Sequence, residues 1–295
     1  MSGSITLENR FGVNKMELIS LKYAIFVIVL LVLYYCFPKK YRWYVLLAGS
    51  MAYYVIICKW YVLFIIFTIC TTYGSTIWID KLLKEQNAIV KSHKEDWDRQ
   101  TRKEYKEKGR KKRVAVMLFA LLCNFGILAF LKYIPYAGEL GLLLPLGISF
   151  YTFQSMGYVM DVYREIVEPE KNFLKVALFV SFFPQIIQGP IAIYDKLAGQ
   201  LYEGHSLRLE NLQKGALLVL WGVMKKLVIA DRAVNIINFV MDKPMDFSGT
   251  YVFFAAVVYA LQLYADFSGG IDIVRGIAEM FGITMSTNFN HPYFS

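Results

Sequence analysis

The sequence predicts an all-α, polytopic membrane protein, and three observations lead to this class. Of the 295 residues, 57% are hydrophobic and only 19% are charged, whereas a soluble domain usually carries about 25% charged residues. The chain holds 22 Phe and 21 Tyr, and aromatic side chains favour membrane interfaces. Several apolar runs are longer than a strand or helix of a soluble core, and in a hydrocarbon layer such runs are expected as helices.

The first half of the chain alternates apolar runs with polar segments. Residues 1–22 form a polar N-terminal segment. An uncleaved span is expected after it, because the strong positive cluster at 39–42 follows the apolar run and no small-residue cleavage site is visible. The second and third runs are separated by one lysine, which predicts a tight hairpin. The runs that predict spans are 23–37, 43–58, 60–79, 114–131 and 140–160.

A basic loop, residues 81–113, separates the third run from the fourth. It contains 13 Lys and Arg residues against six Asp and Glu residues, a net charge of +7. Another basic cluster, residues 39–42, lies two spans earlier, so both can lie on one side of the membrane. Because basic loops stay in the cytoplasm, we expect 81–113 to be cytoplasmic and the N-terminus to lie outside.

The same counts argue against other classes of protein. A basic run can bind nucleic acid, but here the positive-inside rule accounts for it, and no nucleic-acid partner is expected. The four cysteines lie in or beside apolar runs without CxxC spacing, which is typical of small buried side chains. The three histidines are far apart in the sequence, so no metal site is predicted.

The second half has a less regular pattern. Residues 173–193 are apolar but contain Pro and Gly, which predicts a broken or re-entrant helix. Residues 194–214 are polar and predict a surface helix. An apolar run at 215–230 is divided by two lysines. A span is expected at 252–264, followed by a separate short helix at 271–283.

Two segments place polar and helix-breaking residues within membrane-grade apolar sequence. Residues 144–164 read LPLGISFYTFQSMGYVMDVYR, and residues 182–191 read FFPQIIQGPI. Such residues are expensive in lipid and are tolerated mainly where protein or a water-filled cavity surrounds them. Together they indicate a polar pathway inside the protein.

Five motifs in series carry a resemblance to a known family. They are the two segments above, KKLVIADR at 225–232, YALQLYADFSGGIDIVRGIAEMFGI at 259–283 and NFNHPYFS at 288–295. In this order and spacing the chain resembles the bacterial branch of the membrane-bound O-acyltransferase (MBOAT) family, which includes alginate O-acetylation and teichoic-acid D-alanyl-transfer members. The motifs cover residues 144–295, and the earlier residues match only in their pattern of spans and basic loop.

The resemblance implies an enzyme, an O-acyltransferase, in a multi-pass fold: a ring of helices around a thin centre, with broken or re-entrant segments. It implies transfer of an acetyl or D-alanyl type group from a cytoplasmic thioester, acyl-CoA or an acyl-carrier protein, toward hydroxyls of a cell-surface polysaccharide or teichoic acid. A bacterial plasma (inner) membrane location follows, with membrane lipids and an extracytoplasmic acyltransferase- or esterase-like protein as partners. No bound cofactor is expected.

The resemblance also identifies what the given residues lack. In similar proteins the NFN-x-PY motif is followed by a Trp- and Arg-rich stretch with one histidine, and an invariant histidine comes later. We therefore expect both family histidines to lie beyond Ser295, and residues 1–295 to be the N-terminal portion of a single membrane domain without its general base. No catalytic residue is expected within 1–295: His291 occupies a variable position of the motif and is not expected to be catalytic.

Five polar residues are candidates for the substrate pathway: Gln154, Gln185, Gln188, Asp266 and Ser268. The two glutamines of FFPQIIQGPI either line a funnel or bind carbonyls freed by a helix break. Asp266 either orients a catalytic group or pairs with Arg275. Alternatively, Asp266 or Ser268 is the N-cap of a helix that begins near Gly270.

Two other classes of function stay open at this point. A transporter or channel also contains broken helices at mid-depth, although paired interrupted spans in two halves are not visible here. A truncated, non-catalytic remnant is the third interpretation.

Overall fold

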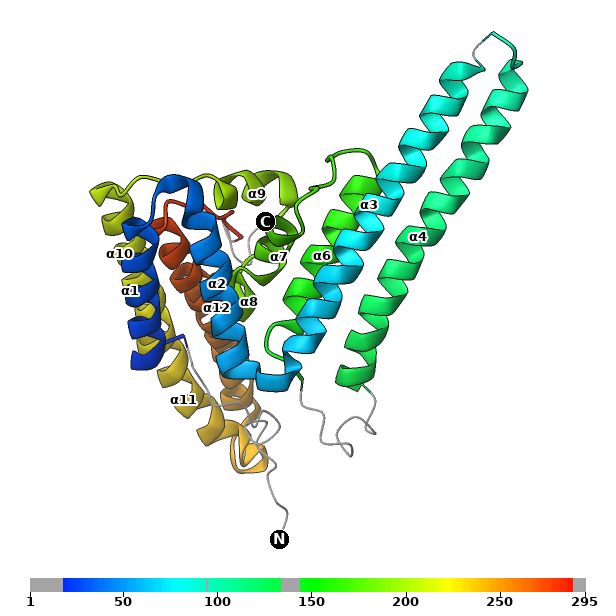
Figure 1. Ribbon diagram of the computed structural model, residues 1–295. Coiled ribbons are helices and arrows are strands. Elements are labelled where there is room, and N and C mark those ends of the chain that lie inside the picture. Colours follow the sequence, from blue (N-terminus) through cyan, green and yellow to red (C-terminus); the bar gives the residue numbers. More distant parts are fainter. Residues whose placement is uncertain (1–17, 94, 134–143, 289–295) are drawn as a thin grey trace. The chain divides into compact units, whose positions relative to one another are not determined.

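The computed structural model describes residues 18–93, 95–133 and 144–288 (Figure 1). Most of these residues are helical and none of them forms a strand, so the predicted all-α class is confirmed. The helices are α1 (Leu21–Cys36), α2 (Arg42–Cys58), α3 (Val62–Ser92), α4 (Arg99–Tyr133), α6 (Ile148–Tyr163), α7 (Phe173–Ser181), α8 (Phe183–Gln188), α9 (Tyr194–Tyr202), α10 (Leu209–Met224), a π-helical turn (Lys225–Ala230), α11 (Asp231–Met241) and α12 (Gly249–Met280).

Three helical stretches of the described chain are long and apolar enough to cross a membrane. They are Lys39–Ser92, which joins α2 and α3 through a 3₁₀ turn, Arg99–Tyr133 and Gly249–Met280. The helices Leu21–Cys36 and Phe173–Gln188 are apolar but shorter. These helices fit a multi-pass membrane protein. The described residues nevertheless contain fewer helical stretches long enough to cross a membrane than the number of spans expected from the apolar runs.

One compact unit comprises residues 47–183 and 193–199 among those described. Within it α3, α4 and α6 pack against one another, and α7 packs on α3. The buried face of α3 carries small hydroxyl residues, among them Thr68, Thr72 and Thr76; the side chains of Thr72 and Thr76 donate to the carbonyl four residues earlier. Small residues let helices approach closely in lipid, so this stripe explains why α3 is the central helix of the unit.

The turn between α2 and α3 lies where the sequence places it. Lys59 takes a positive φ of 48°, which ends α2 and reverses the chain. Beyond the turn, however, α3 packs on α4 and α6, and Figure 1 shows α2 and α3 diverging. The prediction of a turn at Lys59 is therefore confirmed, whereas the prediction that the two helices pack on each other as a tight hairpin is wrong.

The basic segment 81–113 is largely helical and not an irregular loop. Residues 81–92 continue α3 and residues 99–113 begin α4, and we call these two helical ends the arm (Figure 1). The two helices meet where Gln86, 5% exposed, donates its amide to the Lys106 carbonyl at 2.8 Å beside Gly109. Lys and Glu are good helix formers. A charged segment of this composition therefore continues the helices α3 and α4 beyond their apolar parts. Its cytoplasmic location stays a prediction.

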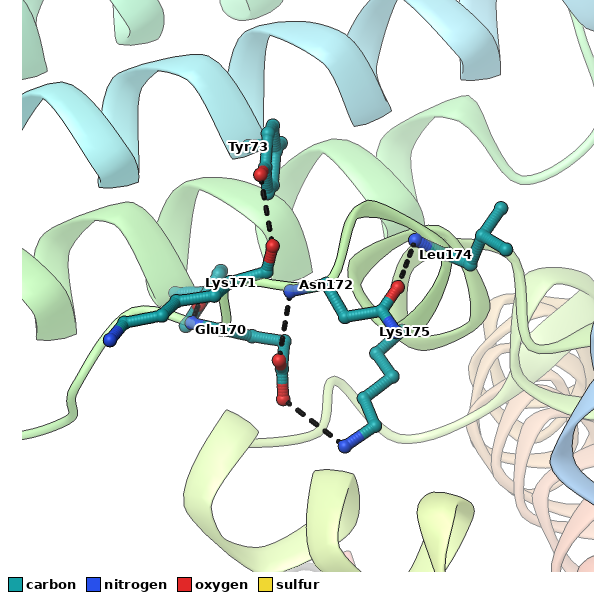
Figure 2. A network of polar contacts seen from close by, with 7 residues as sticks. Tyr73, Glu170, Lys171, Asn172, Leu174 and Lys175 are labelled. Carbon is teal, nitrogen blue, oxygen red and sulfur yellow. Dashed lines mark hydrogen bonds and ion pairs between the residues drawn. The ribbon is translucent and has the colours of Figure 1, made fainter. Parts of the chain in front are cut away.

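The loop between α6 and α7 is held by a network of polar contacts (Figure 2). Tyr73 of α3 donates its hydroxyl to the Lys171 carbonyl at 3.0 Å. Asn172 is the N-cap of α7, accepting from the Leu174 amide at 2.9 Å. Glu170 accepts from the Asn172 amide and pairs with Lys175 at 3.7 Å. The loop is therefore fixed to α3 and to the start of α7.

The other unit comprises residues 16–46, 184–192 and 200–295, of which 18–46, 184–192 and 200–288 are described. Its centre is the antiparallel pair α10 and α12. A Cβ atom on Gly222 would lie 2.4 Å from the Gly269 carbonyl oxygen, and one on Gly215 would lie 2.5 Å from that of Gly276. Only glycine fits at such distances, so two glycine pairs set the closest approach of these helices.

Two predictions on helix boundaries are tested in this region. The helix break within 173–193 is confirmed: α7 ends at Ser181, α8 begins at Phe183, and α8 ends before Gly189 and Pro190. The separate helix at 271–283 is wrong, because α12 continues without interruption from Gly249 to Met280. Gly269 and Gly270 are interior positions at which α12 packs closely on other segments.

Candidate functional site

The first part of the candidate site is the end of α8. Gln185 is 2% exposed, and its amide nitrogen donates to the Pro190 carbonyl at 2.6 Å. A Cβ atom on Gly189 would lie 2.6 Å from the Gln185 Cα, so the chain can turn here only through glycine. Gln185 therefore binds a carbonyl of the loop beyond the break, as the structural interpretation expects.

The same side chain keeps one free acceptor. The amide oxygen of Gln185 is buried and has no hydrogen-bond partner. A buried acceptor without a donor is uncommon in native proteins and carries a desolvation cost. An O–H or N–H group of a ligand or a water molecule would satisfy it. The structural role and a substrate contact are thus compatible at Gln185.

Gln188 connects the end of α8 to α12. A Cβ atom on Gly270 would lie 2.1 Å from the Gln188 amide oxygen, so the glutamine occupies the space that glycine leaves on the helix. Gln188 is partly exposed. Its amide is therefore held against α12 one turn from the charged residues of that helix.

A cluster of charges lies between the end of α10, the π-helical turn and α12. Lys225 contacts Asp272 with 2.6 Å between Nζ and Oδ2, and these side chains are 14% and 12% exposed. Asp272 also accepts from Arg275 at 3.4 Å. Lys226 pairs with Asp266. Because ions in apolar helices are expensive unless paired, these contacts explain how the charges are tolerated.

This cluster changes two predictions from the sequence. Asp266 is not an N-cap, because it lies in the interior of α12, and it pairs with Lys226 and not with Arg275. Ser268 is not an N-cap either; it is 3% exposed and its hydroxyl is buried without a partner. Both residues nevertheless lie on the helix that carries the cluster.

The local backbone at the two lysines is unusual. Residues 225–230 form a π-helical turn, and π turns in helices occur frequently at functional sites. The Lys225 ammonium also lies over the rings of Trp221 and Tyr264, 5.6 and 5.9 Å from their centroids. Carboxylates and aromatic faces together hold this ammonium in place.

The cluster has a net charge of +1 with three cations, Lys225, Lys226 and Arg275, and two carboxylates. It can therefore stabilise a negative charge that develops nearby, while the unpartnered oxygens of Gln185 and Ser268 can accept hydrogen bonds. Within the described residues no group of three metal-type side chains is found. The absence of a cofactor stays a prediction.

The remaining candidates have other places. Gln154 lies in the unit of α3, α4 and α6, is 3% exposed, and donates to the Phe179 carbonyl at 2.8 Å, a structural role. His205 bonds the Gln200 carbonyl at 2.7 Å, and His93 stacks on Trp97 in the turn of the arm.

The end of the NFNHPYFS motif lies outside the described residues. His291 and Ser295 both belong to this segment, residues 289–295. Two expectations from the sequence therefore stay predictions: that His291 is not catalytic, and that the family histidines lie beyond Ser295. The two histidines that the structure does describe are held by the contacts given above, and neither lies on a helix of the charge cluster.

Sequence reasoning missed the partnership of Lys225 with Asp272. The two lysines were noted only as a division of the apolar run 215–230, and Asp272 was not singled out. A signal was present, because the apolar run with the lysines and the run with Asp266 and Asp272 carry opposite charges. Unlike charges in two neighbouring spans predict an interhelical pair.

Comparisons with known proteins agree with the resemblance. No family model matches the chain. The chain is 33% identical over 215 residues to the peptidoglycan O-acetyltransferase of Helicobacter pylori, covering 60% of this chain and 41% of that protein. It is 36% identical over 155 residues to the probable alginate O-acetylase AlgI of Pseudomonas syringae pv. tomato, covering 52% and 29%.

A third relative is more distant. The chain is 26% identical over 156 residues to the teichoic acid D-alanyltransferase of Bacillus subtilis, covering 51% of this chain and 38% of that protein. All three relatives are members of the MBOAT family, so the resemblance predicted from the five motifs is confirmed. The matched segments span less than half the length of each of these relatives.

Proposed function

We propose that the chain is part of a membrane O-acyltransferase that transfers an acetyl or D-alanyl type group to hydroxyls of a cell-envelope polymer. One observation carries the proposal: relatives named for three different polymers are all acyltransferases. The feature common to their names is acyl transfer, while the polymer varies. Peptidoglycan therefore joins polysaccharide and teichoic acid as an acceptor class.

The donor in this proposal is a cytoplasmic thioester, acyl-CoA or an acyl-carrier protein, and the location is the bacterial plasma membrane with the arm in the cytoplasm. Thioester chemistry suits the transfer, because a thiolate is a good leaving group when a hydroxyl attacks the acyl carbon. An extracytoplasmic acyltransferase- or esterase-like protein would receive the group or complete its transfer.

The geometry of the site residues supports the following proposed roles. The free amide oxygen of Gln185 accepts a hydrogen bond from the acyl carrier or acceptor, and Gln188 extends the polar surface along Gly270. The Lys225–Asp272 pair and Arg275 provide positive charge close to this surface, where it favours a developing oxyanion. The general base is expected outside these residues.

The test of the function is deletion of the gene that encodes the chain, followed by mild alkaline release of ester-linked acetate and D-alanine from envelope polymers. We expect one ester to fall to background and to return when the gene is restored. Unchanged esters in the deletion strain would reject acyl transfer and favour a transporter or a remnant.

The test of the site compares two buried glutamines. Gln185→Leu and Gln154→Leu each remove an amide that satisfies one carbonyl, of Pro190 and of Phe179 respectively. Each is expected to cost about 1–3 kcal/mol of stability. We expect only Gln185→Leu to lower the ester content per molecule of protein, measured with quantitative immunoblots. Equal ester content per molecule in both variants would remove Gln185 from the pathway.

A further inference from the structure

The net charge of the arm is concentrated next to the membrane-spanning part of α4. Residues 91–104 hold five cations and four acids, which nearly balance. Residues 105–113 hold six cations and one acid. Arg113 is turned inward, 8% exposed and paired with Glu165 at 2.7 Å. The other five cations of residues 105–113 are exposed and have no ion-pair partner in the described chain. We call this group the basic collar, which consists of Lys106, Lys108, Arg110, Lys111 and Lys112.

The basic collar surrounds the outer side of α4. Gly109 lies against Gln86 of α3, and Arg113 and Val116 are buried, which defines the packed side of the helix. At about 100° per residue, Lys111 points away from that side, Lys108 and Arg110 flank it, and Lys106 and Lys112 lie at the two borders of the packed side. Charges spread in this way fit many separate ligands around a helix better than one flat protein surface.

The length of α4 places the collar at the height of lipid headgroups. Residues 114–133 rise about 30 Å, the thickness of the hydrocarbon core. The outer side of this segment is apolar and exposed, with Leu122 at 73%, and Tyr133 at its far end is 72% exposed. If residues 114–133 cross the core, residues 108–112 lie about 3–9 Å beyond it, within the headgroup layer.

We propose that the basic collar is a binding surface for the phosphate groups of anionic phospholipids. Each cation contacts a different lipid in the ring that surrounds α4, and the apolar face below the collar contacts the acyl chains of the same lipids. The attraction between the cations and the lipid phosphates acts in addition to the contact between the apolar face and the acyl chains, and it is screened by salt. It does not depend on the proposed enzymatic function.

The experiment compares two triple variants of the purified chain. K108Q/R110Q/K111Q removes two lysines and one arginine of the collar, and K91Q/R99Q/K103Q removes the same residue types at the tip of the arm. All six are exposed, and glutamine is a good helix former, so helicity by circular dichroism should be equal. Each purified chain is mixed, in a neutral detergent, with equal amounts of phosphatidylglycerol and phosphatidylcholine. Native mass spectrometry then counts the molecules of each lipid that the chain retains.

We expect the wild-type chain and the tip variant to retain phosphatidylglycerol preferentially, and the collar variant to lose up to about a hundredfold of this preference, as three cations near a lipid surface predict. The preference should weaken at about 0.5 M salt and persist in millimolar inorganic phosphate, which separates a lipid site from a free-phosphate site. No preference in the wild-type chain, an equal loss in both variants, or displacement by inorganic phosphate would overturn the proposal.

Discussion

Removing the Asp272 carboxylate is expected to destabilise the protein more than any other single charge removal in the cluster. At 2.6 Å, the Lys225–Asp272 attraction is about 6 kcal/mol at an effective dielectric constant of about 20. Desolvation of the two ions offsets most of this energy while both are present. Asp272→Asn keeps the shape but leaves Lys225 buried without its counter-charge, which costs about 3–5 kcal/mol.

The second pair is the internal control for this prediction. Lys226 and Asp266 are 26% and 35% exposed, so solvent screens them and their net contribution is at or below about 1 kcal/mol. Asp266→Asn should therefore lower the midpoint of thermal unfolding in detergent much less than Asp272→Asn. Tryptophan fluorescence and size-exclusion chromatography after heating measure both.

A double replacement separates charge pairing from packing. Lys225→Met with Asp272→Leu removes both ions, and apolar substitutes for a buried pair are often neutral or stabilising. We expect this variant to unfold close to the wild-type midpoint and above Asp272→Asn alone. Similar midpoints for Asp272→Asn and Asp266→Asn, or a double variant less stable than Asp272→Asn, would refute the reasoning.

Two further predictions concern topology and helix packing. An impermeant lysine reagent applied to intact cells should leave residues 81–113 unlabelled and label them after the membrane is permeabilised; labelling of intact cells would reverse the proposed orientation. Gly222→Ala should destabilise the protein, because its Cβ would lie 2.4 Å from the Gly269 carbonyl oxygen. Gly126→Ala, where nothing lies within 4 Å, should be neutral or stabilising by up to about 1 kcal/mol; equal losses would contradict the packing.

The sequence predicted the helical membrane class because that class follows from composition and from the length of apolar runs, which are local properties. It also predicted a helix break within 173–193, and α8 ends there after Gln188, since Pro190 lacks an amide hydrogen and Gly189 allows the chain to turn. The family resemblance rested on motifs in fixed order, and the relatives confirm it.

The errors arose where distant residues decide. Gly269 and Gly270 fall between the span expected at 252–264 and the separate helix expected at 271–283, and glycine has low helix propensity, yet α12 continues through them. Their function is to let Gly222 and Gln188 approach, a contact that periodicity cannot reveal. The charged arm was expected to be a loop because polarity was equated with irregular structure. Its helix is favoured by propensity and by the Gln86 contact with α4.

The ion pairs between the π-helical turn and α12 depend on the glycine pairs between α10 and α12. Close approach of α10 and α12 at Gly222 and Gly269 brings the lysines of the π-helical turn within reach of carboxylates on α12. At a wider separation the buried Lys225 and Asp272 would be left in an apolar medium without partners, which would be more expensive than the pairing now observed. A bulky residue at Gly222 should therefore also weaken the Lys225–Asp272 contact. The combined loss from Gly222→Leu and Asp272→Asn should be smaller than the sum of the single losses, because both changes disrupt the same contact.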